Sequence, residues 1–243
     1  MKAIILAAGK GKRLHSEQFT LPKVMREANG RPLLGYVTDS LSFIDKKDTI
    51  IVVGYKREKV MESFPGYVFA YQEEQLGTGH AVNSARELLR DYDGPVLVCY
   101  GDMPLFTSET YRNAFARHAE TGADCTIITG VTDMPLAYGR IIRDEYGSFV
   151  TVVEDRDCTP EQKLIRELNV GVYIFDSKKL FEALGSLRNN NAQGEYYLTD
   201  APEIIRENGG KIETYTINDG EQLLGVNTPE ELALCEKLLS RRA

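Results

Sequence analysis

The sequence begins with Met1-Lys-Ala-Ile-Ile-Leu-Ala-Ala-Gly-Lys-Gly-Lys-Arg13-Leu14. An apolar run at residues 3–8 ends at two closely spaced glycines, and three cationic side chains follow at once. This pattern predicts a buried strand whose carboxyl end faces a ligand, because glycine lets backbone N–H groups approach a bound group closely. Lys10, Lys12 and Arg13 add positive charge at that end. The stretch therefore predicts an anion site, and a nucleoside phosphate is the expected ligand.

Two better-known phosphate motifs do not fit this stretch. A P-loop requires G-x-x-x-x-G-K-[ST], but Gly9 and Gly11 are too close together, and Arg13 stands where Ser or Thr is needed. A dinucleotide-binding fold requires G-x-G-x-x-G, and Leu14 occupies the place of its third glycine. A glycine pair alone also fits a plain strand-to-helix turn with solvated lysines, so the rest of the chain must decide.

The composition is typical of a soluble globular protein. The chain has 243 residues, of which 42% are hydrophobic and 27% charged, enough for one large or two small domains. A net charge of -7 argues against non-specific nucleic-acid binding. No apolar stretch is long enough to span a bilayer, and the N-terminus does not resemble a signal peptide. We therefore expect a cytoplasmic protein that binds neither nucleic acid nor membrane.

The cysteines and histidines do not predict a metal centre. The three histidines are not clustered, and the four cysteines lie far apart without a C-x-x-C pair. This spacing argues against zinc and fits a reducing compartment. The cysteines are Cys99, Cys125, Cys158 and Cys235.

Apolar runs alternate with segments of helical periodicity along the chain. Strands are predicted at residues 3–8, 49–55, 68–72, 96–100, 125–131, 140–143, 150–154, 169–175 and 212–217. Helices are predicted at about 32–44, 56–64, 79–91, 108–121, 178–184, 196–208 and 229–241. The early strands are continuously apolar, as in a parallel sheet that is covered on both faces. The pattern predicts an α/β fold with a Rossmann-like open, mostly parallel, twisted sheet and helices on both faces.

Asp102 is the single residue that the sequence most strongly suggests as functional. It follows the apolar run 96–100 closely, so its carboxylate is expected at the carboxyl edge of the sheet, where α/β proteins bind ligands. A hard oxygen ligand there suits Mg²⁺, which usually takes one or two protein ligands together with substrate phosphates. The alternative is a helix N-cap or a turn residue, because Pro104 and a predicted helix near residue 108 follow.

Asn227 is a second candidate ligand, directly before the last predicted helix. Thr228 and Glu231 form a capping box at the start of that helix, and Pro229 suits its first position. The alternative for Asn227 is a plain turn residue, since Asn favours turns.

Further motifs follow one another in order along nearly the whole chain. They are Leu6-Ala-Ala-Gly-Lys-Gly-Lys-Arg13, Leu21-Pro-Lys23-Val, Glu74-Gln-Leu-Gly-Thr-Gly-His-Ala81, Tyr100-Gly-Asp-Met-Pro-Leu105, Tyr138-Gly-Arg-Ile141, Glu154, Glu167-Leu-Asn-Val-Gly171, Asn189-Asn-Asn-Ala-Gln-Gly-Glu-Tyr-Tyr-Leu-Thr-Asp200 and Gly225-Val-Asn-Thr228. Each alone is weak evidence. The ordered set resembles the uridyltransferase domains of the bacterial N-acetylglucosamine-1-phosphate uridyltransferases, the N-terminal halves of bifunctional enzymes that make UDP-N-acetylglucosamine.

The resemblance implies a single nucleotidyltransferase domain over residues 1–243, of the nucleotide-diphospho-sugar transferase type. Its nucleotide-binding half covers about residues 1–105, its sugar-binding half about 106–228, and a C-terminal helix the remaining 229–243. The implied reaction transfers a uridylyl group from UTP to N-acetylglucosamine 1-phosphate with Mg²⁺ as cofactor, and releases pyrophosphate. The alternatives are a nucleotidyltransferase for another sugar or alditol phosphate, and a catalytically silent nucleotide-sugar sensor.

The resemblance also implies roles for individual residues. The backbone expected to hold the uridine is that of Leu6, Ala7, Ala8 and Gly9. The residues expected to recognise the uracil and ribose are Gln72, Gly77 and Thr78. Catalysis is expected from Arg13, Lys23 and Asp102, and Mg²⁺ binding from Asp102 and Asn227. The acetamido-sugar pocket is expected at Gly139, Glu154, Asn169, Tyr196, Tyr197 and Thr199.

The chain departs from the family pattern in two places. The segment between Arg13 and Lys23 is about three residues longer than expected, which puts the conformation over the phosphates in doubt. The family continues into a left-handed β-helix that acetylates glucosamine 1-phosphate, whereas this sequence stops after the predicted last helix. We therefore expect either a stand-alone transferase, with a separate acetyltransferase as a candidate partner, or an excised domain. The oligomeric state of the family is not carried over.

Overall fold

A computed structural model of the chain describes residues 1–14, 21–134, 136–191 and 193–242. The extra length expected between Arg13 and Lys23 falls on residues 15–20, which lie outside the described residues.

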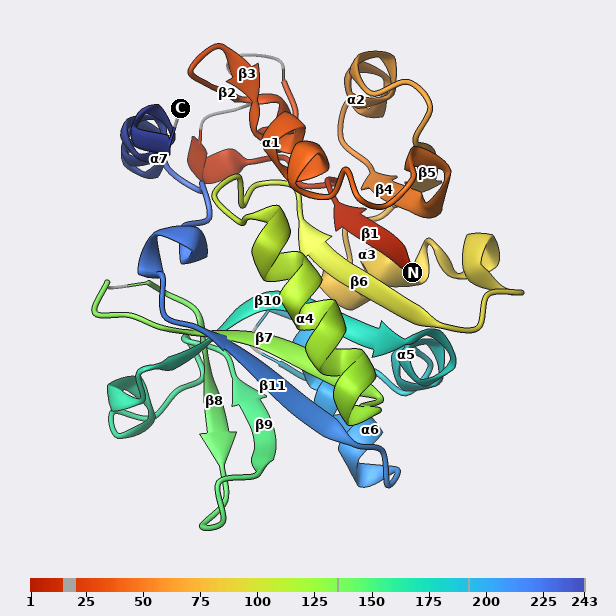
Figure 1. The fold of residues 1–243 in the computed structure, drawn as a ribbon, viewed down its shortest axis with the longest axis vertical. Coiled ribbons are helices and arrows are strands. Elements are labelled where there is room, and N and C mark those ends of the chain that lie inside the picture. Colours follow the sequence, from red (N-terminus) through yellow and green to blue (C-terminus); the bar gives the residue numbers. More distant parts are fainter. Residues whose placement is uncertain (15–20, 135, 192, 243) are drawn as a thin grey trace.

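A nine-stranded sheet forms the centre of the molecule (Figure 1). Its main path runs β11-β7-β10-β6-β1-β4-β5. These strands are β1 (Lys2–Leu6), β4 (Thr49–Val53), β5 (Val68–Tyr71), β6 (Pro95–Tyr100), β7 (Cys125–Val131), β10 (Glu167–Asp176) and β11 (Ile212–Ile217). β5, β4, β1 and β6 are parallel, whereas β10 runs antiparallel to both of its neighbours. A hairpin of β8 (Gly139–Arg143) and β9 (Phe149–Val153) extends from β10.

Helices cover both faces of this sheet, as predicted (Figure 1). One face carries α1 (Leu33–Ser40) and α4 (Ser108–Thr121), and the other carries α3 (Thr78–Asn83), α5 (Ser177–Leu184) and α6 (Ala201–Glu207). The remaining helices are α2 (Arg57–Ser63), which follows β4, and α7 (Pro229–Arg242) at the C-terminus. The open α/β sheet predicted from the sequence is therefore confirmed.

The first strand shows why its sequence is continuously apolar. Ala3, Ile5 and Ala7 pack into the core under α1 and α4, whereas the residues between them pack into the core on the other face. Successive side chains of a strand point to opposite faces, so a strand covered on both sides must be apolar at every position. This burial fixes β1 in the middle of the parallel half of the sheet.

The register between β1 and β6 places the candidate ligand-binding segments side by side. Leu6 pairs with Tyr100, and the carbonyl of Leu6 accepts a hydrogen bond of 3.0 Å from the backbone N–H of Gly101. Both strands are parallel and end there. The glycine turn after β1 and the carboxylate of Asp102 after β6 therefore reach the same edge of the sheet.

Three helices are shorter than predicted, and the first of them, α1 (Leu33–Ser40), ends four residues before the predicted residue 44. The helix expected over residues 79–91 ends at Asn83 and is followed by a 3₁₀ turn, Arg86–Leu89. The Ser84 hydroxyl donates to the carbonyl of His80 at 3.1 Å, a local bond that competes with continued helix. The helix expected over 196–208 begins as a 3₁₀ turn, Leu198–Asp200, and is α-helical only over Ala201–Glu207.

A small hairpin absent from the sequence-based prediction supports the C-terminal helix. It consists of β2 (Glu27–Ala28) and β3 (Arg31–Pro32), joined by Asn29 and Gly30 at φ values of 52° and 74°. The side-chain amide of Asn29 donates to the carbonyl of Glu236 in α7 at 3.0 Å. A separate apolar cluster, which includes Leu14, Ala28 and Leu232, joins these elements.

Candidate functional site

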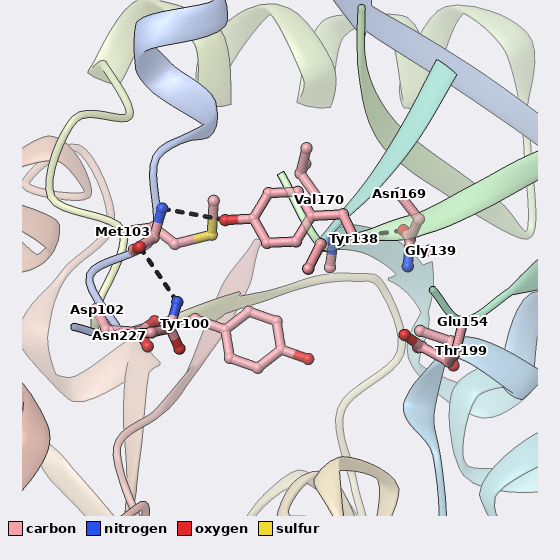
Figure 2. A pocket seen from close by; sticks show the side chains of 13 residues that line it. Tyr100, Asp102, Met103, Tyr138, Gly139, Glu154, Asn169, Val170, Thr199 and Asn227 are labelled. Atoms are coloured by element: carbon pink, nitrogen blue, oxygen red, sulfur yellow. Dashed lines mark hydrogen bonds between the residues drawn. The ribbon is translucent and has the colours of Figure 1, made fainter. Parts of the chain in front are cut away.

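Three adjoining cavities open at the carboxyl edge of the sheet, and Tyr100 lines all of them. Their volumes are about 320, 170 and 330 Å³. Figure 2 shows the smallest one: Asp102 and Asn227 lie at one end, Glu154 and Thr199 lie at the other, and Tyr100 lies between them. The site is therefore elongated. We call the end at Asp102 and Asn227 the ionic end; the opposite end carries the hydroxyl of Thr199 and the carboxyl of Glu154.

The cavity of about 320 Å³ brings together the residues expected to bind nucleotide. Its lining includes Leu6, Ala7, Ala8, Gly9, Lys23, Gln72, Gly77, Thr78, Asp102 and Asn227. Gln75 and Glu195 also line it, although neither was predicted as a site residue. Gln75 donates from its side-chain amide to the carbonyl of Ala8 at 2.6 Å, and this bond fixes the turn that follows β1.

The other two cavities bring together most of the residues expected to bind the sugar. The cavity of about 170 Å³ is lined by Gly139, Glu154, Asn169 and Thr199. The one of about 330 Å³ is lined by Glu154, Tyr197, Thr199 and also Arg13.

Tyr196 lines none of these cavities. Its carbonyl accepts from the backbone N–H of Gly79, and its own N–H donates to Leu76, both at 2.8 Å. Its backbone therefore holds the loop before α3. Of the two adjacent tyrosines, only Tyr197 contributes to a cavity.

Four polar side chains from distant parts of the sequence converge at the ionic end. The ammonium of Lys23 forms an ion pair with Asp102 and donates to Oδ1 of Asn227 at 2.8 Å. The guanidinium of Arg13 donates to the same oxygen at 3.0 Å. The side chains of Lys23 and Asp102 are only 15% and 16% exposed, so solvent screens this pair weakly. The N-cap alternative for Asp102 is wrong, because Thr107 caps α4.

The capping box of α7 fixes the position of Asn227. One carboxylate oxygen of Glu231 accepts from the backbone N–H groups of Asn227 at 2.6 Å and of Thr228 at 2.9 Å. The backbone N–H of Val226 donates to the carbonyl of Asp102 at 2.9 Å. The two candidate metal ligands are therefore tied together through the main chain as well as through Lys23.

Tyr138 lines the smallest cavity together with Asp102 and Glu154. Its hydroxyl donates to the carbonyl of Leu223 at 2.8 Å. It also accepts from the backbone N–H of Gly225 at 3.0 Å, a bond marked in Figure 2. Burial raises the pKa of Tyr138, with Asp102 adding to the shift. The phenol is therefore a neutral tether for the segment that leads to Asn227.

A bulge in β10 lies next to Asn169, which lines the cavity of about 170 Å³. The register with β7 shifts between Asn169 and Val172, and the Asn169 carboxamide accepts from the backbone N–H of Gly171 at 3.3 Å. The hydroxyl of Tyr173 also contacts this carboxamide, at 3.0 Å from its oxygen and 2.8 Å from its nitrogen. A bulge at this position redirects side chains at the end of a strand.

Glu154 is the acidic residue at the end of the smallest cavity that lies away from Asp102 (Figure 2). Burial raises the pKa of Glu154, the hydroxyl of Thr199 lowers it, and Asp157 and Asp155 raise it further. Among the described residues, the Thr199 hydroxyl has no hydrogen-bond partner that satisfies normal geometry, although it is buried. An unsatisfied hydroxyl beside a buried carboxyl is a polar pair prepared for a ligand's hydroxyl or amide.

Neighbouring Asp200 also has a raised pKa, of about 6, caused first by burial and then by Glu203 and Glu154. Burial likewise raises the pKa of Tyr100, with Glu154 and Asp102 adding to it. The phenol of Tyr100 is therefore neutral at physiological pH and separates the cavities as an uncharged ring.

The chemistry open to this site is charge neutralisation and alignment. The described residues that line the three cavities include no Ser, Cys or His, the usual nucleophiles of covalent catalysis. The ionic end instead offers two cations and two oxygen ligands, Asp102 and Asn227. Such a set suits polyphosphate substrates, whose transfer depends on positioning and electrostatic stabilisation.

Comparison with known proteins shows the family of the chain. The sequence profile of the MobA-like NTP transferase domain matches residues 3–197. The bifunctional protein GlmU of Streptococcus thermophilus is 46% identical over 241 residues, which are 99% of this chain and 52% of that protein. The bifunctional protein GlmU of Thermoanaerobacter pseudethanolicus is 46% identical over 240 residues, 98% of this chain and 51% of that protein. The chain thus spans about half the length of the curated relatives it matches.

A solved structure shares the fold. The nucleoside-diphosphate-sugar pyrophosphorylase of Vibrio cholerae RC9 superposes with a TM-score of 0.72, covering 98% of this chain and 100% of that chain at 19% identity. Within the described residues, no helix has the length and apolarity needed to cross a membrane.

We expect Gly171→Ala to displace the Tyr100 ring and to destabilise the protein more than Gly147→Ala does. Both glycines have positive φ, 77° and 82°, so alanine introduces the same left-handed strain of about 1–2 kcal/mol at each. A Cβ at Gly147 would meet nothing within 4 Å, whereas one at Gly171 would lie 2.4 Å from the Tyr100 ring. Urea unfolding measures both losses of free energy, and equal losses would contradict this packing.

Proposed function

The chain belongs to the family of MobA-like NTP transferase domains, and we propose that it transfers the uridylyl group of UTP to N-acetylglucosamine 1-phosphate, giving UDP-N-acetylglucosamine and pyrophosphate. The observation that carries the proposal is the convergence of two cavities on the Lys23–Asp102–Asn227 contact. One cavity has the size and backbone lining for a nucleotide, and the other has the polar groups for a sugar. The charged contact lies where their two phosphate groups would meet.

The reaction requires no enzyme nucleophile. A phosphate oxygen of the sugar phosphate attacks the α-phosphorus of UTP in line, and the bond from that phosphorus to the pyrophosphate oxygen breaks. Lys23 and Arg13 neutralise the two polyanions, which otherwise repel each other. Alignment of two bound reactants can lower the barrier by roughly 7–11 kcal/mol, a contribution that needs only rigid cavities and fixed cations.

The donor set at the ionic end fits Mg²⁺. The carboxylate of Asp102 and the side-chain oxygen of Asn227 both contact the Lys23 ammonium, so these two oxygens already converge on a cation. Mg²⁺ is commonly held by one or two such ligands together with water and substrate phosphates. When bound, the ion would stabilise negative charge on the reacting phosphates. The described residues contain no group of three or more His, Cys, Asp or Glu side chains that could hold a metal.

Sugar recognition is assigned to Glu154, Asn169 and Thr199. Their carboxyl, carboxamide and hydroxyl groups can accept from and donate to sugar hydroxyls and an acetamido group. Because burial raises the pKa of Glu154, its carboxylate takes up a proton at higher pH than an exposed glutamate does. Hydrogen bonds that this carboxylate accepts from the sugar are therefore present above the raised pKa and are lost as the pH falls through it.

Wild-type protein is expected to release pyrophosphate from UTP in the presence of Mg²⁺ and N-acetylglucosamine 1-phosphate, and much less with glucose 1-phosphate. The physical reason is that the buried carboxamide of Asn169 and hydroxyl of Thr199 would lose a partner without the acetamido group. A coupled pyrophosphate assay compares the two sugars. If pyrophosphate is released with glucose 1-phosphate but not with N-acetylglucosamine 1-phosphate, the protein is a nucleotidyltransferase and the proposed sugar is wrong. Release with neither, by protein that binds UTP, would favour another sugar or alditol phosphate or a silent sensor.

Glu231→Ala should raise the Mg²⁺ concentration needed for half-maximal activity roughly tenfold, as loss of supporting contacts to a metal ligand commonly does. The carboxylate that holds the backbone of Asn227 is then gone. Glu231→Gln keeps a side-chain oxygen at the same place and should remain near wild type. Loss of the Glu231 hydrogen bonds also costs about 1 kcal/mol of stability, which urea unfolding records separately. An alanine variant that loses stability but keeps the wild-type Mg²⁺ dependence would refute the positioning role.

A further inference from the structure

The side-chain amide of Gln72 is held by two neighbours in the first turn of α3. Its nitrogen donates to the carbonyl of Gly77 at 3.0 Å and lies 3.2 Å from Nδ1 of His80. Gln72 is only 6% exposed and lines the nucleotide cavity. The role of His80 is not explained by the cavities, because His80 lines none of the three.

The Gly77 carbonyl decides which end of the amide faces the helix. A carbonyl can only accept, so the Gln72 atom beside it must be the NH₂ group. The same carbonyl accepts the first helical bond of α3, from the backbone N–H of Ala81 at 3.1 Å. Gly77 itself cannot shift easily: its φ is 112°, and a Cβ there would lie 2.6 Å from the carbonyl of Tyr196. The acceptor that orients Gln72 is therefore part of a rigid turn.

The orientation of Gln72 fixes the state of His80 in turn. Because the amide nitrogen also faces Nδ1, this ring nitrogen must accept, and the proton of the neutral imidazole lies on Nε2. Both amide hydrogens are then used, one on Gly77 and one on His80. The carbonyl oxygen of Gln72 has no partner among the described residues and is the only part of the amide left for a ligand.

We propose that His80 is a positioning residue that sets base specificity by locking the Gln72 amide with its oxygen toward the nucleotide base. This inference rests on the proposed nucleotide site. An outward-facing carbonyl accepts from a base edge that donates, such as N3–H of uracil, and opposes N3 of cytosine, which can only accept. Without the His80 acceptor, one of the two bonds that prevent the amide from flipping is lost, and a flipped amide would present NH₂ to the base.

The test uses two variants of similar size. Asn at position 80 can place its side-chain oxygen close to where Nδ1 accepts, whereas Leu cannot accept at all. We expect His80→Asn to keep the preference for UTP over CTP and His80→Leu to lose roughly tenfold of it, the equivalent of about one net hydrogen bond. Isothermal titration of wild type and both variants with UTP, CTP and pyrophosphate, each with Mg²⁺, gives the affinities. Pyrophosphate does not contact the base subsite, so its affinity should be unchanged in both variants.

A purely structural role for His80 predicts a different pattern. In that case His80→Leu would lower the affinity for all three ligands together and leave the ratio of UTP to CTP unchanged, which would overturn the proposal. Equal binding of UTP and CTP by the wild type would also overturn it. The titration measures binding and requires no turnover. If the wild type binds UTP more tightly than CTP but shows no activity, the proposed reaction is wrong and the inference on His80 still holds.

Discussion

The contact of Lys23 with Asp102 and Asn227 is the interaction on which the site depends. It joins three segments that are about 80 and 125 residues apart in the sequence, and its ion pair is mostly hidden from solvent. Removing one partner of such a pair leaves an uncompensated charge in a low-dielectric place, which is strongly destabilising. The contact therefore requires each segment to be held independently, and each has its own support. Val24 and Met25, next to Lys23, are buried in the core, and β6, which leads to Asp102, pairs with β1. The Glu231 carboxylate and the Tyr138 hydroxyl hold the segment of Asn227.

The same contact would let a protein with a net charge of -7 bind the two polyanions of the proposed reaction. The cations are local: Arg13 and Lys23 donate to the same oxygen of Asn227, and each lines one of two adjoining cavities. At the other end of the site, burial raises the pKa of Glu154 and of Tyr100. Positive charge is thus concentrated where phosphates would meet, and the flanking cavities contribute shape and hydrogen bonds.

The sequence predicted much of this architecture, and its omissions have physical reasons. Buried parallel strands can be recognised in the sequence as continuous apolar runs. The capping box of Thr228 and Glu231 likewise predicts the start of α7 from local sequence alone. The hairpin at Asn29-Gly30 was missed although Asn-Gly is a strong turn signal, because its two-residue strands are too short to show alternation. The place of Tyr100 between the cavities depends on the β10 bulge and on Gly171, which packs against its ring. These residues are distant in sequence and meet only because the strands pair, so no local pattern predicts the contact. No local pattern distinguishes Tyr197, which lines a cavity, from Tyr196, which holds a loop.

The central claim is that the uridylyl group passes directly between two aligned substrates, without a covalent intermediate on the protein. Stereochemistry at the α-phosphorus tests this claim most directly. The measurement uses UTP with a chiral α-thiophosphate and determines the configuration of the sugar-nucleotide product by phosphorus NMR. A single in-line displacement inverts the configuration, and the account predicts inversion. Retention would mean two successive displacements through an enzyme-bound uridylyl group, and would contradict a site that acts by alignment and charge alone.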